Sequence, residues 1–463
     1  MEFEQLLGIV IFACTVATYL TFLGLGRRWR RGFEAKGIKY WRAPKEKRVK
    51  ELMSDVWHPK IVAAFYTMAY FTNGYMKITF SMWAPLFLLQ YKGIGTFEAA
   101  LFIALIYTPW QWKMFVGMVS DAIPIKFKGR IYRRKQWFLI AGIFSIAATT
   151  IFLFSDPMEM PVWTTLFLTF TALTSAGAIF DMAADAYAVD VIPPEFHARV
   201  LGVCNTVGQA IGGAVASLAP IILLRLGGYQ LVFIIGGLTG ILAFPFLLLK
   251  EPKLEYERVF SKLAIAFTFT EKTVLAAALL MMNVSIGIAR ISNPTGGMFS
   301  LIMNEVLGNL SPEQAGNIAL AALLAGIPGS LIGGWVADKW GHKRIYIISG
   351  IVAALSGYLW ATLRPSIIWF VTLAMATNFI MRFNAGSRMA LMGDATPLAL
   401  SATVFQMYMS FTWIGNVPSS LIVGILLPVN LPLLMVFLSS ISFIPLVFAR
   451  FIKPYEVGKA VKV

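Results

Sequence analysis

The chain has 463 residues, of which 58% are hydrophobic and 13% are charged, against the roughly 25% charged residues that are usual in soluble globular domains. Its formal charge is +16, but the basic residues form short stretches between apolar runs, which excludes a nucleic-acid-binding domain with a basic face. The apolar runs are about 20 residues long, enough to cross roughly 30 Å of hydrocarbon. The composition therefore predicts an all-α integral membrane protein.

The first apolar run, within residues 1–26, carries its positive charge on the C-terminal side. Acidic residues come before it, and Arg27 and Arg28 follow directly. A cleaved signal peptide has the opposite order, so we expect an extra, retained transmembrane helix with its N-terminus outside the cell. Residues 27–60 are strongly basic, and we expect a cytoplasmic linker that either lies along anionic headgroups or is simply solvated.

The remaining apolar runs divide into two sets of six. Residues 61–250 hold the first set, residues 273–463 hold the second, and a polar central loop over residues 251–272 joins them. Basic residues gather in alternate loops and in the C-terminal tail, which the positive-inside pattern places in the cytoplasm. We therefore predict thirteen transmembrane helices in the cell membrane, with the C-terminus cytoplasmic.

Matched landmarks recur in the two halves. In each half, a Gly-x-x-x-Asp sequence precedes the third helix, and an aspartate followed three residues later by proline closes the fourth. Repeats of this kind are expected of a duplicated transporter fold, and polar residues at helix ends are typical of structural gates. The predicted gating residues are Gly117, Asp121, Asp190, Gly334, Asp338 and Asp394.

The landmark in the second half, which continues from Gly334 through Asp338 to Arg344, resembles the loop signature of the major facilitator superfamily. The resemblance implies that fold: two six-helix halves, here with one extra N-terminal transmembrane helix. It also implies that Asp121 and Asp338 meet helix N-termini of the opposite half. The copy in the first half is stretched by an insertion after Asp121.

Further motifs in the first half narrow the resemblance. They look like the branch that holds the muropeptide permeases and the acetyl-coenzyme A transporters, with the folate–biopterin transporters as a more distant look-alike. The extra helix and the insertion depart from the muropeptide permeases. The motifs are Pro109-Trp110-x-x-Lys113, Asp181-x-Ala183-x-Asp185-Ala186 and Cys204-Asn205-Thr206-Val207-Gly208-Gln209.

Ionisable residues within the apolar runs are the main evidence for function. A charge in mid-membrane costs about 2.5–3.5 kcal/mol on insertion scales, so these residues either join helices as salt bridges or line a water-filled cavity. Bases outnumber acids five to two, which favours an anionic organic solute. The residues are Lys77, Lys113, Asp181, Asp185, Arg290, Arg382 and Arg388.

The first helix of each half contains residues that favour a break: Asn73-Gly74 before Lys77, and Asn293 to Gly297 after Arg290. Matched breaks point to a central binding site, although a kink could serve packing alone. We predict that the solute is bound by Lys77, Lys113, Arg290, Asn73, Trp110 and Gln406.

Asp181 and Asp185 are four residues apart, on one face of a helix. Two stacked carboxylates in a low dielectric cannot both ionise without cost, which suits a proton carrier. The alternative is that either carboxylate pairs with Lys113 or Arg388. We predict that this pair couples transport to protons.

The sequence thus predicts a secondary active transporter of a small organic anion, coupled to protons and working by alternating access. Its expected partners are the solute, the coupling ion and membrane lipids, with no nucleic acid, cofactor or metal. The alternative is a non-transporting scaffold or assembly factor that binds pigment, lipid or partner membrane proteins, which the extra N-terminal helix would serve. An enzyme is excluded, because the sequence has no nucleotide-binding glycine loop, metal-ligand cluster or placed Ser/His/Asp set.

Overall fold

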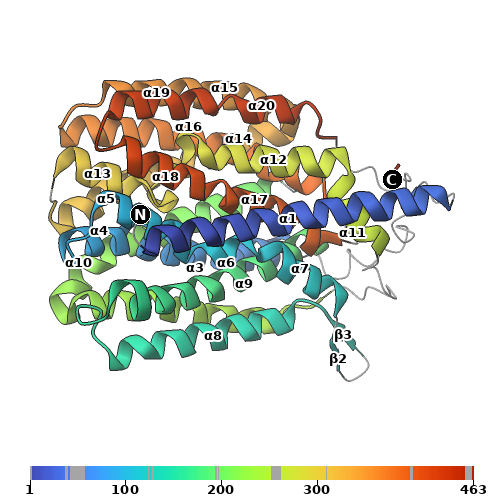
Figure 1. Ribbon diagram of the computed structural model, residues 1–463, viewed down its shortest axis with the longest axis horizontal. Helices are drawn as coiled ribbons and strands as arrows, with labels where there is room; N and C mark the ends of the chain where they lie inside the picture. The colour runs from blue at the N-terminus through green and yellow to red at the C-terminus, as the bar shows by residue number, and fades with distance from the viewer. Residues whose placement is uncertain are drawn as a thin grey trace.

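Helices that run side by side along the long axis make up almost the whole molecule (Figure 1). The structure is a computed structural model that describes residues 3–36, 40–41, 58–123, 125–127, 130–192, 196, 198–251, 262–308, 310–396, 400–453 and 461–462. Most of the predicted linker over residues 27–60 lies outside these residues, as do residues 252–261 of the predicted central loop over residues 251–272. So do the prolines that follow Asp190 and Asp394.

Within the described chain, nine helical segments are long and apolar enough to span a membrane. One of them, Val200–Leu248, holds two crossings, because Gly227 and Gly228 interrupt its helical backbone. Three further crossings are built from shorter helical pieces, over residues 59–90, 96–122 and 272–307. Together they form two six-helix halves, preceded by the extra helix α1 (Phe3–Ala35). The fold predicted from the sequence is confirmed.

The first half contains a π-helical turn in its first crossing and two breaks in its second. Its elements are α3 (Pro59–Ile78), η1 (Thr79–Trp83), α4 (Ala84–Gln90), α5 (Thr96–Ile106), α6 (Thr108–Gln111), α7 (Lys113–Ala122), α8 (Lys135–Phe154), η2 (Val162–Leu166), α9 (Phe167–Val191), η4 (Ala198–Cys204), α10 (Asn205–Leu238) and η5 (Thr239–Leu248).

The second half begins with a strongly broken crossing and is reached through a short helix, α11 (Lys262–Thr270), inside the predicted central loop. Its elements are α12 (Lys272–Ile286), η6 (Ile288–Arg290), η7 (Pro294–Gly296), α13 (Phe299–Leu307), α14 (Pro312–Trp340), α15 (His342–Tyr358), η8 (Leu359–Thr362), α16 (Ile367–Asp394), α17 (Ser401–Ile414), α18 (Asn416–Leu426), α19 (Leu431–Ile441) and α20 (Ile444–Ala449).

Short strand pairs lie at one end of the bundle. The insertion after Asp121 forms an antiparallel hairpin of β2 (Ile125–Phe127) and β3 (Arg130–Tyr132). At the same end, β1 (Tyr40–Trp41) pairs with β4 (Val461–Lys462) near the C-terminus (Figure 1). We call this the signature end, because Asp121 and Asp338 lie there, and the opposite end the far end.

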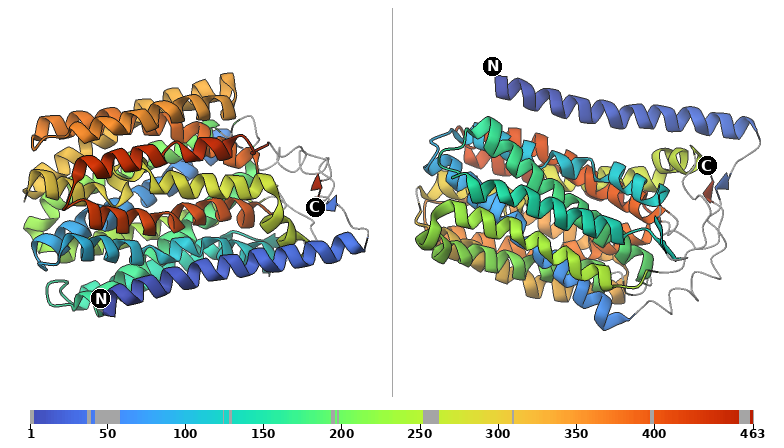
Figure 2. Two further views of the ribbon diagram at one scale, coloured as in Figure 1. Left: turned by 45° about the horizontal axis from the view of Figure 1, so that its top comes forward. Right: turned by 90° about the horizontal axis from the view of Figure 1, so that it is seen from below.

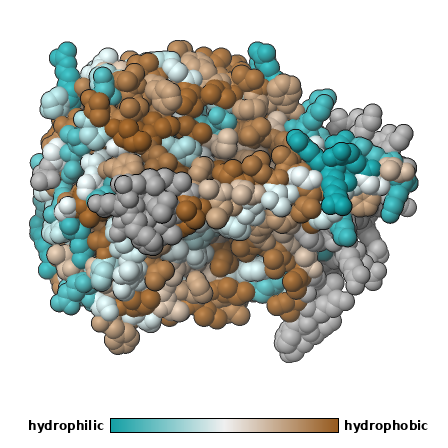
Figure 3. All heavy atoms as spheres, viewed as in Figure 1, coloured by the Kyte–Doolittle hydropathy of each residue, from teal (hydrophilic) through white to brown (hydrophobic). Residues whose placement is uncertain are grey.

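The outer surface matches a membrane environment. In Figure 3, hydrophobic residues cover much of the middle of the visible face, and hydrophilic residues gather toward its two ends. Helix α1 lies along the outside of the bundle and extends past it at the signature end (Figure 2). This surface is the one expected where lipid surrounds the helices.

Glycines let the two halves approach closely at both ends. At the signature end, a Cβ added to Gly117 of α7 would lie 2.5 Å from the carbonyl oxygen of Ala402 in α17. At the far end, a Cβ added to Gly316 of α14 would lie 2.5 Å from the carbonyl oxygen of Ser217 in α10. The two halves therefore make backbone contact at both ends and enclose the centre between them.

The predicted helix breaks are correct in the second half and wrong in the first. Between α12 and α13 the backbone is irregular, and Gly297 has a φ of 89°, a conformation that glycine adopts without strain. In contrast, Asn73 and Gly74 lie inside the continuous helix α3. Gly74 instead makes room for the backbone of Gln209 in α10, which a Cβ would strike.

Candidate functional site

A cavity of about 160 Å³ lies between the two halves, near the middle of the bundle. Residues of α3, α9 and α10 line it on one side, and residues of the broken crossing, α16 and α17 line it on the other. The lining residues used below are Lys77, Trp110, Asp181, Arg290, Asn293, Thr295, Arg382, Arg388 and Trp413.

Four bases face this cavity against one acid. Lys77 and the arginines at 290, 382 and 388 line it, and the acid is Asp181. Asp181 already accepts a hydrogen bond from Lys113 in a buried ion pair. No carboxylate among the described residues lies within ion-pair distance of any of the four lining bases. The cavity therefore carries surplus positive charge.

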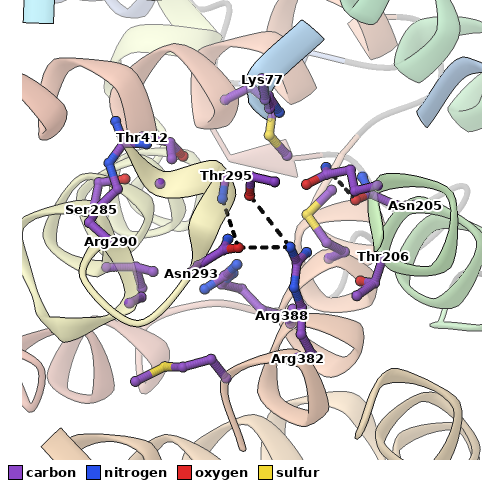
Figure 4. A pocket seen from close by; sticks show the side chains of 18 of the residues that line it. Lys77, Asn205, Thr206, Ser285, Arg290, Asn293, Thr295, Arg382, Arg388 and Thr412 are labelled. Carbon is purple, nitrogen blue, oxygen red and sulfur yellow. Dashed lines mark hydrogen bonds between the residues drawn. The ribbon is translucent and has the colours of Figure 1, made fainter. Parts of the chain in front are cut away.

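The three arginines have buried N–H groups that make no hydrogen bond within the described residues. Arg382 donates from Nη2 to Oδ1 of Asn293 at 3.2 Å and to Oγ1 of Thr295 at 3.5 Å, and Lys77 approaches the cavity from the opposite side (Figure 4). Nε and Nη2 of Arg290, Nε of Arg382 and Nε of Arg388 are buried and have no hydrogen-bond partner within the described part of the chain. Buried donors without partners are costly, so these groups are suited to donating hydrogen bonds to a ligand oxygen.

Two tryptophans hold the cations in place. Nζ of Lys77 lies 4.7 Å from the ring centroid of Trp110 and 5.7 Å from that of Trp413. Cζ of Arg290 lies 4.6 Å from the centroid of Trp413, which itself stacks on Tyr107 with centroids 4.6 Å apart. Because aromatic faces attract cations, these rings keep the two bases in the cavity without neutralising them.

The two carboxylates predicted for proton coupling share one cation. Nζ of Lys113 contacts Asp181 and lies 3.9 Å from Oδ2 of Asp185. Asp185 is fully buried and otherwise accepts hydrogen bonds from neutral groups, namely the hydroxyls of Tyr66, at 3.0 Å, and Tyr70, and the amide of Gln406, at 3.1 Å. The cluster thus holds two carboxylates and one base.

The predicted site residues fall into two groups, those that line the cavity and those that bind the carboxylate pair. Lys77, Trp110 and Arg290 line the cavity, and so does Asp181. Lys113, Asn73 and Gln406 are not among its lining residues and bind the carboxylate pair instead. Five of the predicted residues are therefore connected by hydrogen bonds or ion pairs, namely Asn73, Lys113, Asp181, Asp185 and Gln406.

Sequence reasoning missed the contribution of α16. Met381, Arg382, Ala385, Arg388 and Met389 all line the cavity. Their spacing follows the helical period, which places them on one face. Arg382 and Arg388 can each be recognised in the sequence as a charge within an apolar run. Their helical spacing is the signal that could have placed both of them in one site.

At the signature end, Arg134 connects the predicted gating residues of the first half. It donates from Nη2 to Asp121 and from Nε to Asp190, both at 2.9 Å. Burial lowers the pKa of Arg134, but the adjacent carboxylates of Asp190 and Asp121 outweigh burial and raise this pKa overall. The guanidinium therefore keeps its charge.

Asp121 also contacts the second half of the protein. Oδ2 of Asp121 accepts hydrogen bonds of 2.8 Å from the backbone N–H and from the hydroxyl of Thr403, in the first turn of α17. A carboxylate is favourable at a helix N-terminus. In the second half, His342 takes the bridging position, with Nδ1 2.6 Å from Asp394 and Nε2 3.3 Å from Asp338. The landmarks that repeat in sequence thus also repeat as charge clusters.

Residues 113–289 match the sequence model described as Major Facilitator Superfamily. The chain is 24% identical over 341 residues to a Rickettsia felis protein named as a candidate transporter, AmpG 4, a match that covers 69% of this chain and 80% of the relative. A protein of the same name from Rickettsia conorii is 23% identical over 355 residues, with the same coverage. Over residues 113–289 the chain is therefore similar in sequence to the major facilitator superfamily.

Solved structures of transporters share the fold of this chain. The proton:xylose symporter XylE gives a TM-score of 0.65 at 11% identity, covering 84% of this chain and 94% of that one. The Escherichia coli fucose:proton symporter gives 0.61 at 11% identity, covering 84% and 98%. A bacterial homologue of the iron transporter ferroportin, in an outward-facing state, gives 0.60 at 13% identity, covering 84% and 97%.

The sequence matches and the shared fold are all with multi-pass membrane transporters, and they point to a secondary transporter and not to an enzyme. The predicted resemblance to the muropeptide permease branch is confirmed by the relatives named AmpG. No comparison supports a membrane-protein partner for the extra helix.

Proposed function

We propose that this transporter carries a small organic anion and couples its movement to protons. The observation that supports the anion most directly is the cavity lined by four bases, none of which has a carboxylate partner among the described residues. Uncompensated charge in a low-dielectric interior is costly. A bound anion would compensate this charge.

The chemistry of the lining favours a carboxylate or phosphate group on a flat or ring-shaped solute. Arginine matches planar oxyanions through paired N–H groups, and three arginines meet here. The faces of Trp110 and Trp413 offer a stacking surface beside them. Anionic sugars, acidic peptides and nucleotides all carry such groups.

Proton coupling rests on the pair of carboxylates that share Lys113. When Asp181 or Asp185 takes up a proton, Lys113 no longer has two negative charges to balance. Its Nζ lies 5.0 Å from the ring centroid of Trp110, a cavity-lining residue, so the freed charge strengthens the positive field of the cavity. Proton uptake and anion binding then favour one another, as symport requires.

The test is equilibrium binding to purified protein of three probes, a hexose phosphate, an acidic dipeptide and a nucleoside monophosphate. We expect at least one probe to bind, and Arg290→Gln to weaken its binding by tenfold or more. Arg225→Gln serves as the matched control, because Arg225 is exposed and pairs with Glu313 away from the cavity. Equal affinity of the Arg290 and Arg225 variants would rule out this cavity as the anion site.

A further inference from the structure

The second crossing of the first half is interrupted twice, on either side of α6. Tyr107 and Trp112 have φ and ψ near −90° and 0°, outside the α-helical range. The four residues of α6 thus form a separate segment that carries Trp110. Lys113 follows directly after the second break. The position of this segment therefore sets where both side chains lie relative to the cavity.

Each break leaves a main-chain carbonyl that accepts a hydrogen bond from a hydroxyl outside the crossing. At the first break, the hydroxyl of Thr174 in α9 donates to the carbonyl of Ile106. At the second, the hydroxyl of Tyr19 in α1 donates to the carbonyl of Gln111 at 2.7 Å. The N–H of Phe115, which would reach Gln111 in a regular helix, bonds to Trp112 instead. Carbonyls at membrane depth need partners from within the protein.

Tyr19 is held firmly in this position. It is 6% exposed, and its ring packs on Phe115, with centroids 5.4 Å apart, and on Phe411, with centroids 5.1 Å apart. Phe115 belongs to the first half and Phe411 to the second, so the extra helix reaches the line where the halves meet. One turn further along α1, Phe22 stacks on Phe269 of α11 at 5.5 Å.

We propose that Tyr19 is a positioning residue for the central cavity: by binding the carbonyl of Gln111, it fixes the break that places Trp110 and Lys113. The extra N-terminal helix then has a role inside the transport machinery, since it supports the segment that carries the lining residue Trp110. The part of this inference that concerns solute rests on the proposed function. The part that concerns the position of Trp110 does not.

The experiment uses full-length protein labelled with 5-fluorotryptophan and observed by ¹⁹F NMR, with the Trp110 resonance assigned from Trp110→Phe. We expect Tyr19→Phe, which keeps the ring and removes the donor, to shift or split the Trp110 resonance. The resonance of Trp360, buried elsewhere against Thr377, should stay in place. Replacing Tyr19 with 4-aminophenylalanine restores a donor and should restore the resonance.

The matched control is Tyr187→Phe, because the Tyr187 hydroxyl also donates to a main-chain carbonyl, that of Lys250, at 2.9 Å. An unchanged Trp110 resonance in Tyr19→Phe, or an equal shift in Tyr187→Phe, would overturn the proposal. Affinity for the best-binding anionic probe should fall about tenfold in Tyr19→Phe alone. If no probe binds even the unaltered protein, the proposed function fails, while the NMR result still decides the role of Tyr19.

Discussion

At the residue scale, Lys113 serves both carboxylates of the pair next to the cavity, and it is 1% exposed. Breaking a buried pair by removing one partner typically costs about 3–5 kcal/mol, because the remaining charge stays buried. We expect Lys113→Ala to lower the melting temperature of the detergent-solubilised protein markedly. Lys113→Ala combined with Asp181→Asn should recover much of the loss, and Lys77→Ala should show little. A double variant no more stable than the single one would contradict this account.

Asp185 gives the second prediction at this scale. Its other partners are neutral donors, so asparagine can occupy the position but cannot carry a proton. Asp185→Asn should abolish uptake driven by a pH gradient and preserve exchange of solute across the membrane. Proteoliposomes with and without an imposed gradient separate the two modes. Asp156→Asn, in an exposed loop, is the control. Full proton-driven uptake by both Asp181→Asn and Asp185→Asn would show that the carboxylates are structural.

At the scale of the element, α7 and α14 each contribute a glycine that allows one end of the bundle to close. An added Cβ would lie 2.5 Å from a carbonyl oxygen in both cases, too close to be accommodated without a shift of the backbone. We expect Gly117→Ala to hold the signature end open and Gly316→Ala to hold the far end open. A cysteine placed at Thr412, which lines the cavity, reports this through labelling from either side.

The control for both variants is Gly24→Ala in α1, where an added Cβ would meet nothing within 4 Å. The two glycine variants should expose the reporter cysteine to opposite compartments, and the control should leave it as in the parent. Labelling from the same side in both variants would show that these contacts do not act as separate gates.

The helix breaks show which parts of the fold can be predicted from the sequence alone and which cannot. The break between α12 and α13 was predictable, because proline and two adjacent glycines occur within it. The supposed break at Gly74 was not real, because a glycine that permits backbone contact with Gln209 looks the same in sequence as one that bends a helix. Pro109 is a local signal for the break at Tyr107, because proline cannot donate the helical hydrogen bond. The carbonyls left at the two breaks instead bind hydroxyls contributed from α9 and α1. Such tertiary contacts leave no local pattern.

The site shows the same limit. Buried charges were identifiable because each costs energy in an apolar run, and the carboxylate pair because its members are four residues apart. Which charges pair with one another depends on how the helices pack. The sequence therefore could not show that Lys113 has carboxylate partners whereas Lys77 has none among the described residues.

At the scale of the whole molecule, the orientation in the membrane is the property to establish next. The distribution of basic residues predicts an N-terminus outside and a C-terminus inside the cell. Single cysteines at Glu2 and Ala460, tested with an impermeant reagent on intact cells, should label only at the first position. Equal labelling of both would mean an even number of crossings and would refute the assignment.

The surplus of positive charge around the cavity has an electrical consequence. Five bases and two carboxylates meet there, so an empty protein that changes the exposure of the cavity moves net charge relative to the transmembrane field. Each elementary charge that crosses the whole field is worth about 2.3 kcal/mol per 100 mV. A negative interior would then draw the empty cavity inward and slow its return. A bound anion offsets part of that charge, so exchange should depend less on voltage than net flux does, and currents on solid-supported membranes would measure the difference.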